Sequence, residues 1–315
     1  FPEFIPESKS AITQLSKWIN GDEVLIEWRP VYFETPSGFV NGYAYILESN
    51  ADHKTLVLDE QGKLLFSTSN KTHSKPDSVV AINIFKPDPI TSALTEYGFG
   101  FQDFNDSTSP DLGSQLVLDS ITLKWDTNDL SWKLENEAVK AVDFSQPFIS
   151  PYGYYDSTYR LTRSDTGFEY LNAFYHLTKM NQHVKKLGFV SLLNTTVGFD
   201  AYGDIGDQSS FIPSNTNPRL QFGIGGVDDA EDADVIVHEY GHAISYAASP
   251  ETNYGDERKA VDEGFCDFLA YAYSLKINPY DSMKLFNWDG HNEYWVGREI
   301  PQFKTYPTDL KNSIY

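Results

Sequence analysis

An H-E-x-x-H motif inside an apolar run constrains this chain more than any other feature. Residues 234–244 read Asp-Val-Ile-Val-His-Glu-Tyr-Gly-His-Ala-Ile, with the motif at His238, Glu239 and His242. On a helix of about 3.6 residues per turn, residues i and i+4 share one face, so both imidazoles can reach one metal ion. Glu239 then projects beside the metal, where its carboxylate can take a proton from water. The motif predicts a zinc site on a helix over residues 231–247; two histidines on an ordinary structural helix are the alternative.

A second acidic segment offers a third ligand. Residues 257–270 have helical character and place Glu263 and Asp267 four positions apart on one face. Zinc held by two imidazoles needs a third protein ligand and leaves its fourth position to water, and Glu263 meets that need. Asp267, one turn later, can accept the other ring N–H of a ligand histidine and fix its tautomer. A solvated acidic stripe is the alternative interpretation.

The rest of the chain predicts an α+β fold, with β-rich regions before the helices. Short β-branched or aromatic runs predict strands at 24–26, 31–33, 43–47, 56–58 and 64–66, after a short helix at 10–19. The polar stretch 67–77 predicts an exposed linker. We therefore expect a separate helix-plus-sheet domain at 1–75, followed by a β-rich region and then by helices.

The segments after residue 78 predict a mixture of strands, helices and loops. Residues 79–85, 116–118 and 121–125 predict strands, and residues 168–187 and 257–275 predict helices. The segment 200–226 is rich in Gly, Asp, Ser, Asn and Pro and predicts loops around an edge strand at 220–222.

The charge balance excludes several classes of partner. Lys and Arg total 24 against 45 Asp and Glu, so the net charge of −21 argues against binding nucleic acid or an anionic membrane surface. No run approaches the ~18 to 20 apolar residues of a membrane span, so we expect no membrane insertion. The single cysteine, Cys266, excludes an intrachain disulfide framework. The acidic balance favours a secreted protein, and a start at Phe1 suits both a processed chain and an excised fragment.

The two motifs together resemble those of zinc metallopeptidases whose third ligand is glutamate, the thermolysin and fungalysin group. Residues 238–242 (H-E-Y-G-H) and 263–268 (E-G-F-C-D-F) are similar to the fungalysin pattern H-E-Y-x-H followed by E-G-W-S-D-F, with Phe for Trp and Cys for Ser. The similarity extends over residues 80–315 and is specific within 225–268. It implies a thermolysin-like zincin core with the zinc site on two helices. In this core a β-rich lobe at 76–250 ends in the motif helix, and residues 251–315 are the start of a helical lobe.

The resemblance implies roles residue by residue. His238, His242 and Glu263 correspond to zinc ligands, Glu239 to the general base and proton shuttle, and Asp267 to the carboxylate that orients a ligand histidine.

Other positions of the family pattern are matched less completely. Tyr254 stands nine residues before Glu263, like the thermolysin tyrosine that hydrogen-bonds the oxyanion; a packed loop aromatic is the alternative. Residues 209–211 lie near the family's edge segment that pairs with the substrate backbone, but the expected Asn is missing. The later oxyanion-binding histidine is also missing, because Tyr315 stands where it is expected and His291 has a turn-like setting.

An acidic cluster precedes the motif helix. Asp228, Asp229 and Asp234 are candidate calcium ligands, because the matching region of thermolysin binds calcium. Acids at a helix N-terminus also cap it and offset its dipole without any metal. Ser274 falls where the thermolysin site needs a glutamate, which favours capping.

The resemblance sets the functional expectations. It implies a secreted zinc endopeptidase that hydrolyses peptide or protein substrates, with Zn2+ as cofactor and Ca2+ as a second candidate ion. It also implies that residues 1–75 are a propeptide that inhibits the enzyme intramolecularly, with an accessory β-domain as the alternative, and that the C-terminal lobe is truncated. A non-catalytic zinc-binding or degenerate peptidase-like interaction module is the alternative for the whole chain.

Overall fold

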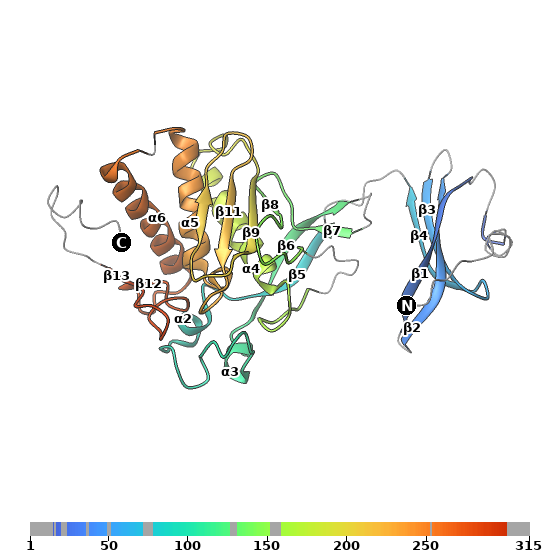
Figure 1. Ribbon diagram of the computed structural model, residues 1–315, viewed down its shortest axis with the longest axis horizontal. Coiled ribbons are helices and arrows are strands. Elements are labelled where there is room, and N and C mark those ends of the chain that lie inside the picture. Colours follow the sequence, from blue (N-terminus) through green and yellow to red (C-terminus); the bar gives the residue numbers. More distant parts are fainter. Residues whose placement is uncertain are drawn as a thin grey trace. The chain divides into compact units, whose positions relative to one another are not determined.

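The protein combines helices and strands in an α+β fold, as predicted. The computed structural model describes residues 15, 17–19, 24–35, 38–48, 52–71, 78–126, 131–151, 159–252 and 254–300. The chain divides into two compact units, Phe1–Pro76 and Asp77–Tyr315, and each is described by itself (Figure 1).

Unit 1 is built on a four-stranded antiparallel sheet. Its strands follow chain order in the sheet and are β1 (Val24–Thr35), β2 (Gly38–Glu48), β3 (Asp52–Asp59) and β4 (Leu64–Lys71). The predicted turn between β3 and β4 is confirmed, because one carboxylate oxygen of Asp59 accepts the backbone N–H groups of Gln61 and Lys63. One face of the sheet carries the core of the unit: Leu15, Tyr43, Tyr45, Leu47, Leu56 and Leu58.

Two sequence predictions for unit 1 were wrong. The runs 24–26 and 31–33 belong to one strand, β1, which continues through Pro30 opposite Tyr43. Because β1 is an edge strand, a proline without an N–H can be accommodated there. The predicted linker at 67–77 begins later, since β4 extends to Lys71. Of the predicted helix at 10–19, only residues 15 and 17–19 are among the described residues, and Leu15 is buried.

Unit 2 contains two larger sheets. The first is antiparallel, in the order β5 (Ser78–Ile84), β6 (Val117–Asp126) and β7 (Ser131–Lys133). The second is mixed, in the order β10 (Ser210–Ile212), β11 (Arg219–Gly223), β9 (Val197–Asp204) and β8 (Val139–Ala141). In the second sheet β9 runs parallel to both neighbours, and β10 is an antiparallel edge strand.

The strand β9 corrects the prediction of loops over residues 200–226. Every residue from Val197 to Gly203 is buried, although Asp200 and Gly203 make this stretch look like a loop in the sequence. The carboxylate of Asp200 accepts hydrogen bonds from the Tyr170 hydroxyl and from backbone N–H groups, which compensates its burial. A Cβ at Gly203 would lie 2.6 Å from the Cβ of Gln221, so the close approach of β9 and β11 requires glycine. The sheet order places β11 between β9 and β10, so β11 is not the expected edge strand.

Three long helices confirm the predicted helical segments; α4 and α5 pack against these sheets, and α6 packs on α5. They are α4 (Phe168–Lys186), α5 (Ala233–Ala248) and α6 (Asp256–Ile277). Figure 1 shows α5 and α6 side by side, with β11 next to α5. The shorter elements are α2 (Pro89–Ala93), α3 (Pro110–Gly113), the 3-10 helix η1 (Asp229–Glu231), β12 (Lys284–Leu285) and β13 (Arg298–Glu299). None of the described helices is long and apolar enough to span a bilayer.

Candidate metal centre

The motif residues lie on the inner part of α5. His238 and Glu239 are 4% and 7% exposed, and the ring centroids of His238 and His242 are 5.0 Å apart. The helix begins with Asp232 as its N-cap, whose side chain accepts the N–H of Asp234. Apolar neighbours of the motif, such as Ile236 and Tyr240, are fully buried in the core, and they fix which face the histidines present.

A close crossing with α6 brings the third ligand to the histidines. A Cβ at Gly241 would lie 2.9 Å from the Sγ and 3.1 Å from the Cα of Cys266, so only glycine permits this approach. The crossing places Glu263 between the two imidazoles. Its Oε2 lies 3.1 Å from Nε2 of His238, and its Oε1 lies 3.6 Å from Nε2 of His242.

Carboxylates also lie beside the opposite ring nitrogens of both histidines. Nδ1 of His238 is 2.9 Å from Oδ1 of Asp267, the aspartate expected from the sequence to lie beside a ligand histidine, and Arg298 forms an ion pair with the same oxygen. Nδ1 of His242 is hydrogen-bonded to Oδ2 of Asp262 at 2.7 Å. Carboxylates in these positions orient both rings so that the two Nε2 atoms face Glu263.

Sequence reasoning missed Asp262. It directly precedes the predicted ligand Glu263, and it is 4% exposed although it is charged. The available signal was helical spacing, because Asp262 is four residues before Cys266 and therefore lies on the face that packs against α5. Burial works against the charged form, but hydrogen bonds from His242 and Ser245 outweigh it and lower the pKa of Asp262 to about 2.

The electrostatics of the crossing suit a cation. Burial opposes the charged form of His238, but Asp267 and Glu263 outweigh it and raise the pKa of this metal-free imidazole to about 9. Burial raises the pKa of Glu239, whose Oε2 has no hydrogen-bond partner among the described residues. A carboxylate left buried and unpaired is costly unless a ligand satisfies it. Two imidazoles and a carboxylate are also the ligand set of catalytic zinc sites, so the residues fit zinc.

Cys266 is a competing third ligand by position alone. Its Sγ lies within 4.8 Å of ligand atoms of both histidines. However, this thiol packs against Gly241 at the helix crossing, whereas Glu263 presents one carboxylate oxygen to each of the two Nε2 atoms. Glu263 is therefore the better placed ligand, and Cys266 serves the close packing of the helices.

Other predicted site residues lie apart from this crossing. Tyr254 is 75% exposed in the segment before α6, and no described contact joins it to the histidines. The imidazole of His291 lies 3.1 Å from the backbone carbonyl of Leu285, so it holds a turn. Tyr315 lies outside the described residues. The segment 209–211 contributes to the edge strand β10, where Phe211 packs on Tyr246 of α5.

The three predicted calcium ligands are not brought together. The side chain of Asp234 accepts hydrogen bonds from Ser274 and from the backbone N–H of Phe286. Asp228 lies in the electrostatic environment of Glu231, whereas Asp229 is associated with Asp207 and Asp289. Burial raises the pKa of Asp229 to about 7. Helix capping was the role favoured from the sequence for this acidic cluster, and the residue that caps α5 in the structure is Asp232.

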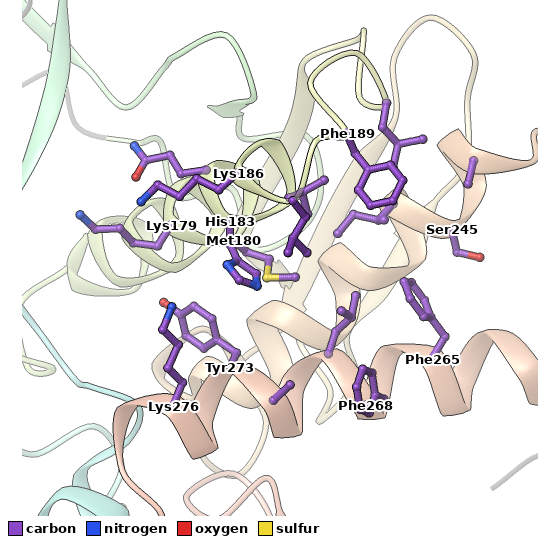
Figure 2. Close-up of a pocket in the computed structure, with 18 of the residues that line it drawn as sticks. Lys179, Met180, His183, Lys186, Phe189, Ser245, Phe265, Phe268, Tyr273 and Lys276 are labelled. Atoms are coloured by element: carbon purple, nitrogen blue, oxygen red, sulfur yellow. The ribbon is translucent and has the colours of Figure 1, made fainter.

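A wide apolar groove lies between α4, α5 and α6. Its volume is about 1010 Å³, and Figure 2 shows Phe265, Phe268 and Tyr273 along α6 on one side of it and Met180 and Phe189 on the other. None of the three predicted zinc ligands lines this groove. The groove and the histidines therefore use different faces of α6.

Comparison with known proteins adds no assignment. No protein-family model matches the chain, and no curated protein sequence matches it.

Proposed function

We propose that this protein is a zinc-dependent peptidase with a thermolysin-like zincin core. One observation carries the proposal: Glu263 lies between the Nε2 atoms of His238 and His242, while carboxylates lie at both Nδ1 atoms. An ordinary structural helix does not need a buried and a half-buried histidine surrounded by acids from a second helix. The resemblance of residues 238–242 and 263–268 to the glutamate zincins supports the same assignment.

The residues divide the work as follows. His238, His242 and Glu263 would hold zinc, and bound zinc supplies a Lewis acid that polarises a carbonyl group and lowers the pKa of water. Asp262 and Asp267 keep the two imidazole rings oriented. Glu239, with its buried unpartnered Oε2, accepts the proton of the attacking water and returns it to the departing amine.

Substrate binding is proposed at the edge strand β10. Among the described strands β10 pairs with β11 alone, so its other edge offers backbone groups to an extended peptide. Peptide or protein is the substrate class that fits such strand addition. The proposal also includes secretion of the protein and its intramolecular inhibition by residues 1–75.

The test separates zinc binding from catalysis. Glu239→Gln is expected to keep one zinc per chain by elemental mass spectrometry and to lose cleavage of a protein substrate by a factor on the order of 10² to 10⁴. Glu263→Gln is expected to lose both zinc and cleavage. Glu257→Gln, an exposed glutamate on the same helix, is the control and keeps both. Unchanged cleavage in Glu239→Gln would contradict the proposal.

A non-catalytic zinc-binding module is the second candidate. The exposed position of Tyr254, away from the histidines, favours it, because no described tyrosine then stabilises an oxyanion. Zinc binding that depends on Glu263, without any cleavage in the wild-type protein, would establish this second candidate.

A further inference from the structure

A second group of carboxylates, outside the histidine site, has the features of a cation site. One carboxylate oxygen from each of Asp207, Asp229 and Asp289 lies within 4.8 Å of the other two. Two oxygens that bind the same calcium ion at ~2.3–2.6 Å are at most ~5 Å apart, so this spacing is compatible with a shared ion. The three residues come from the loop after β9, from η1 and from the segment that follows β12.

Asp289 carries the second observation. Its side chain is buried, with 4% of its surface exposed, and its Oδ1 has no hydrogen-bond partner within the described parts of the chain. Its Oδ2 accepts the indole N–H of Trp295 at 3.2 Å, so the other oxygen is the one left for a ligand. A buried carboxylate oxygen without a partner is rare in folded proteins and indicates a missing ion, water or proton.

No basic side chain neutralises the group. Among the residues that the structure describes, no lysine or arginine forms an ion pair with Asp207, Asp229 or Asp289. The nearby Arg163 is already bound to Glu231 and Asp103. Three neighbouring carboxylates without a basic partner among the described residues form a group whose charge a hard cation can balance.

The backbone holds this arrangement in place. Cβ atoms at Gly223 and Gly225 would meet the backbone of residues 206–208 at 2.4 Å and 2.6 Å, so the loop that carries Asp207 is pressed against the strand end before η1. The N–H of Gly225 also donates to the carbonyl oxygen of Gly206 at 3.0 Å. Asp207 itself is exposed, which gives the group a side open to water.

We propose that Asp207, Asp229 and Asp289 bind one calcium ion. Three carboxylates supply oxygen ligands only, and water on the open side completes the coordination that calcium requires. The site differs from the predicted set Asp228, Asp229 and Asp234, in which Asp234 is already saturated by Ser274 and the Phe286 N–H. It does not depend on the zinc proposal.

The ion would fasten the start of the motif helix. The backbone N–H groups of Trp288 and Asp289 donate to Asp232, the N-cap of α5, at 3.0 and 3.1 Å. Calcium at Asp289 therefore links the segment after β12, the loop after β9 and the residues that begin α5. Its expected effect is thermal stability of unit 2.

Terbium luminescence tests the site directly. The indole of Trp295 is hydrogen-bonded to Asp289, so Tb3+ bound there is expected to show strong tryptophan-sensitised emission, saturating at one ion per chain and displaced by Ca2+. Calcium at a hundredfold excess over its Kd is expected to raise the Tm by on the order of 5 to 10 °C. Zinc content is measured in parallel and stays constant.

Variants decide between a cation and a shared proton. Asp289→Asn and Asp207→Asn are expected to weaken terbium binding at least tenfold and to abolish the calcium-dependent rise in Tm, and Asp207→Asn tests an exposed position that the fold does not need. Glu293→Gln, an exposed acid near Asp289, is the control and keeps both responses. If Asp229 and Asp289 share a proton instead, wild-type protein shows neither emission nor a Tm response, which overturns the proposal. Emission that persists in both variants also overturns it.

Discussion

Two groups of carboxylates in unit 2, each with buried members, differ in what lies opposite them. At the crossing of α5 and α6, Asp262 and Asp267 each approach a ring nitrogen of a histidine. In the second group, Asp229 and Asp289 approach each other. The pKa of Asp262 falls to about 2, because its hydrogen-bond partners outweigh burial, whereas burial raises the pKa of Asp229 to about 7. The comparison teaches that burial alone does not decide the charge of a carboxylate; its partner does.

The largest expected effect comes from removing the buried charge of Arg163 in unit 2. Arg163 is completely buried, with Nε 3.0 Å from both carboxylate oxygens of Glu231 and Nη2 2.6 Å from Oδ1 of Asp103. Arg163→Met is expected to lower the free energy of unfolding by about 3–5 kcal/mol, because it leaves two buried acids unpaired. Denaturant unfolding measures it. Arg160→Met, at an exposed arginine, is the control and is expected to change the value by less than about 0.5 kcal/mol.

The helix crossing that pairs acids with histidines can be forced apart. Gly241→Ala is expected to destabilise the protein by about 1–3 kcal/mol, since its Cβ would clash with Cys266, and to weaken zinc binding. Gly264→Ala on α6 is the matched control: nothing lies within 4 Å of its Cβ, and alanine there is expected to stabilise the helix by about 0.5–1 kcal/mol. Equal unfolding midpoints for the two variants would show that the helices do not cross as closely as described.

The pairing itself is tested by removing one charge at the crossing. Asp262→Asn keeps the shape of the side chain but loses the carboxylate that is hydrogen-bonded to Nδ1 of His242. We expect zinc affinity, measured by competition with a chelator, to fall about 10- to 100-fold. Asp256→Asn, in the exposed first turn of the same helix, is expected to leave the affinity unchanged. If the two variants bind zinc equally, Asp262 does not orient the ring.

The last expected effect concerns His176, a buried histidine whose ring nitrogens have no acidic hydrogen-bond partner among the described residues. The ring nitrogens of His176 contact the Tyr273 hydroxyl and the Phe85 carbonyl, and burial lowers its pKa to about 4. Between pH 6.5 and 4 the unfolded chain therefore binds this proton more readily than the folded protein, and stability is lost as the pH falls.

Comparison with a variant isolates the contribution of His176 to the pH dependence of stability. From pH 7 to pH 5, the wild-type protein is expected to lose about 2 kcal/mol relative to His176→Gln, measured by denaturant unfolding at each pH. Parallel stability curves for the two proteins would mean that His176 titrates normally.

Long helices were predictable from the sequence, because apolar residues in α4 and α5 recur with helical period. The strand β9 was not, since the partners of Asp200 and Gly203 come from α4 and β11, which local sequence does not reveal. The continuous strand β1 was missed for a related reason: whether Pro30 breaks a strand depends on whether that strand is at an edge.

The two carboxylate groups were predictable to different degrees. The ligands at the helix crossing lie in two short segments whose spacing follows helical geometry, so His238, His242, Glu263 and Asp267 could be proposed from the sequence alone. The group of Asp207, Asp229 and Asp289 comes from three separate segments, and only the tertiary fold assembles it. Spacing along the chain carries no information about such a group.

The contact between Gly241 and Cys266 provides a natural probe of the helix crossing. Cys266 is the only cysteine of the chain, it is fully buried, and it lies at a close contact between α5 and α6. A thiol reagent can reach it only when the two helices separate. The rate at which the folded protein is alkylated therefore counts the opening events of the helix crossing, without any introduced label.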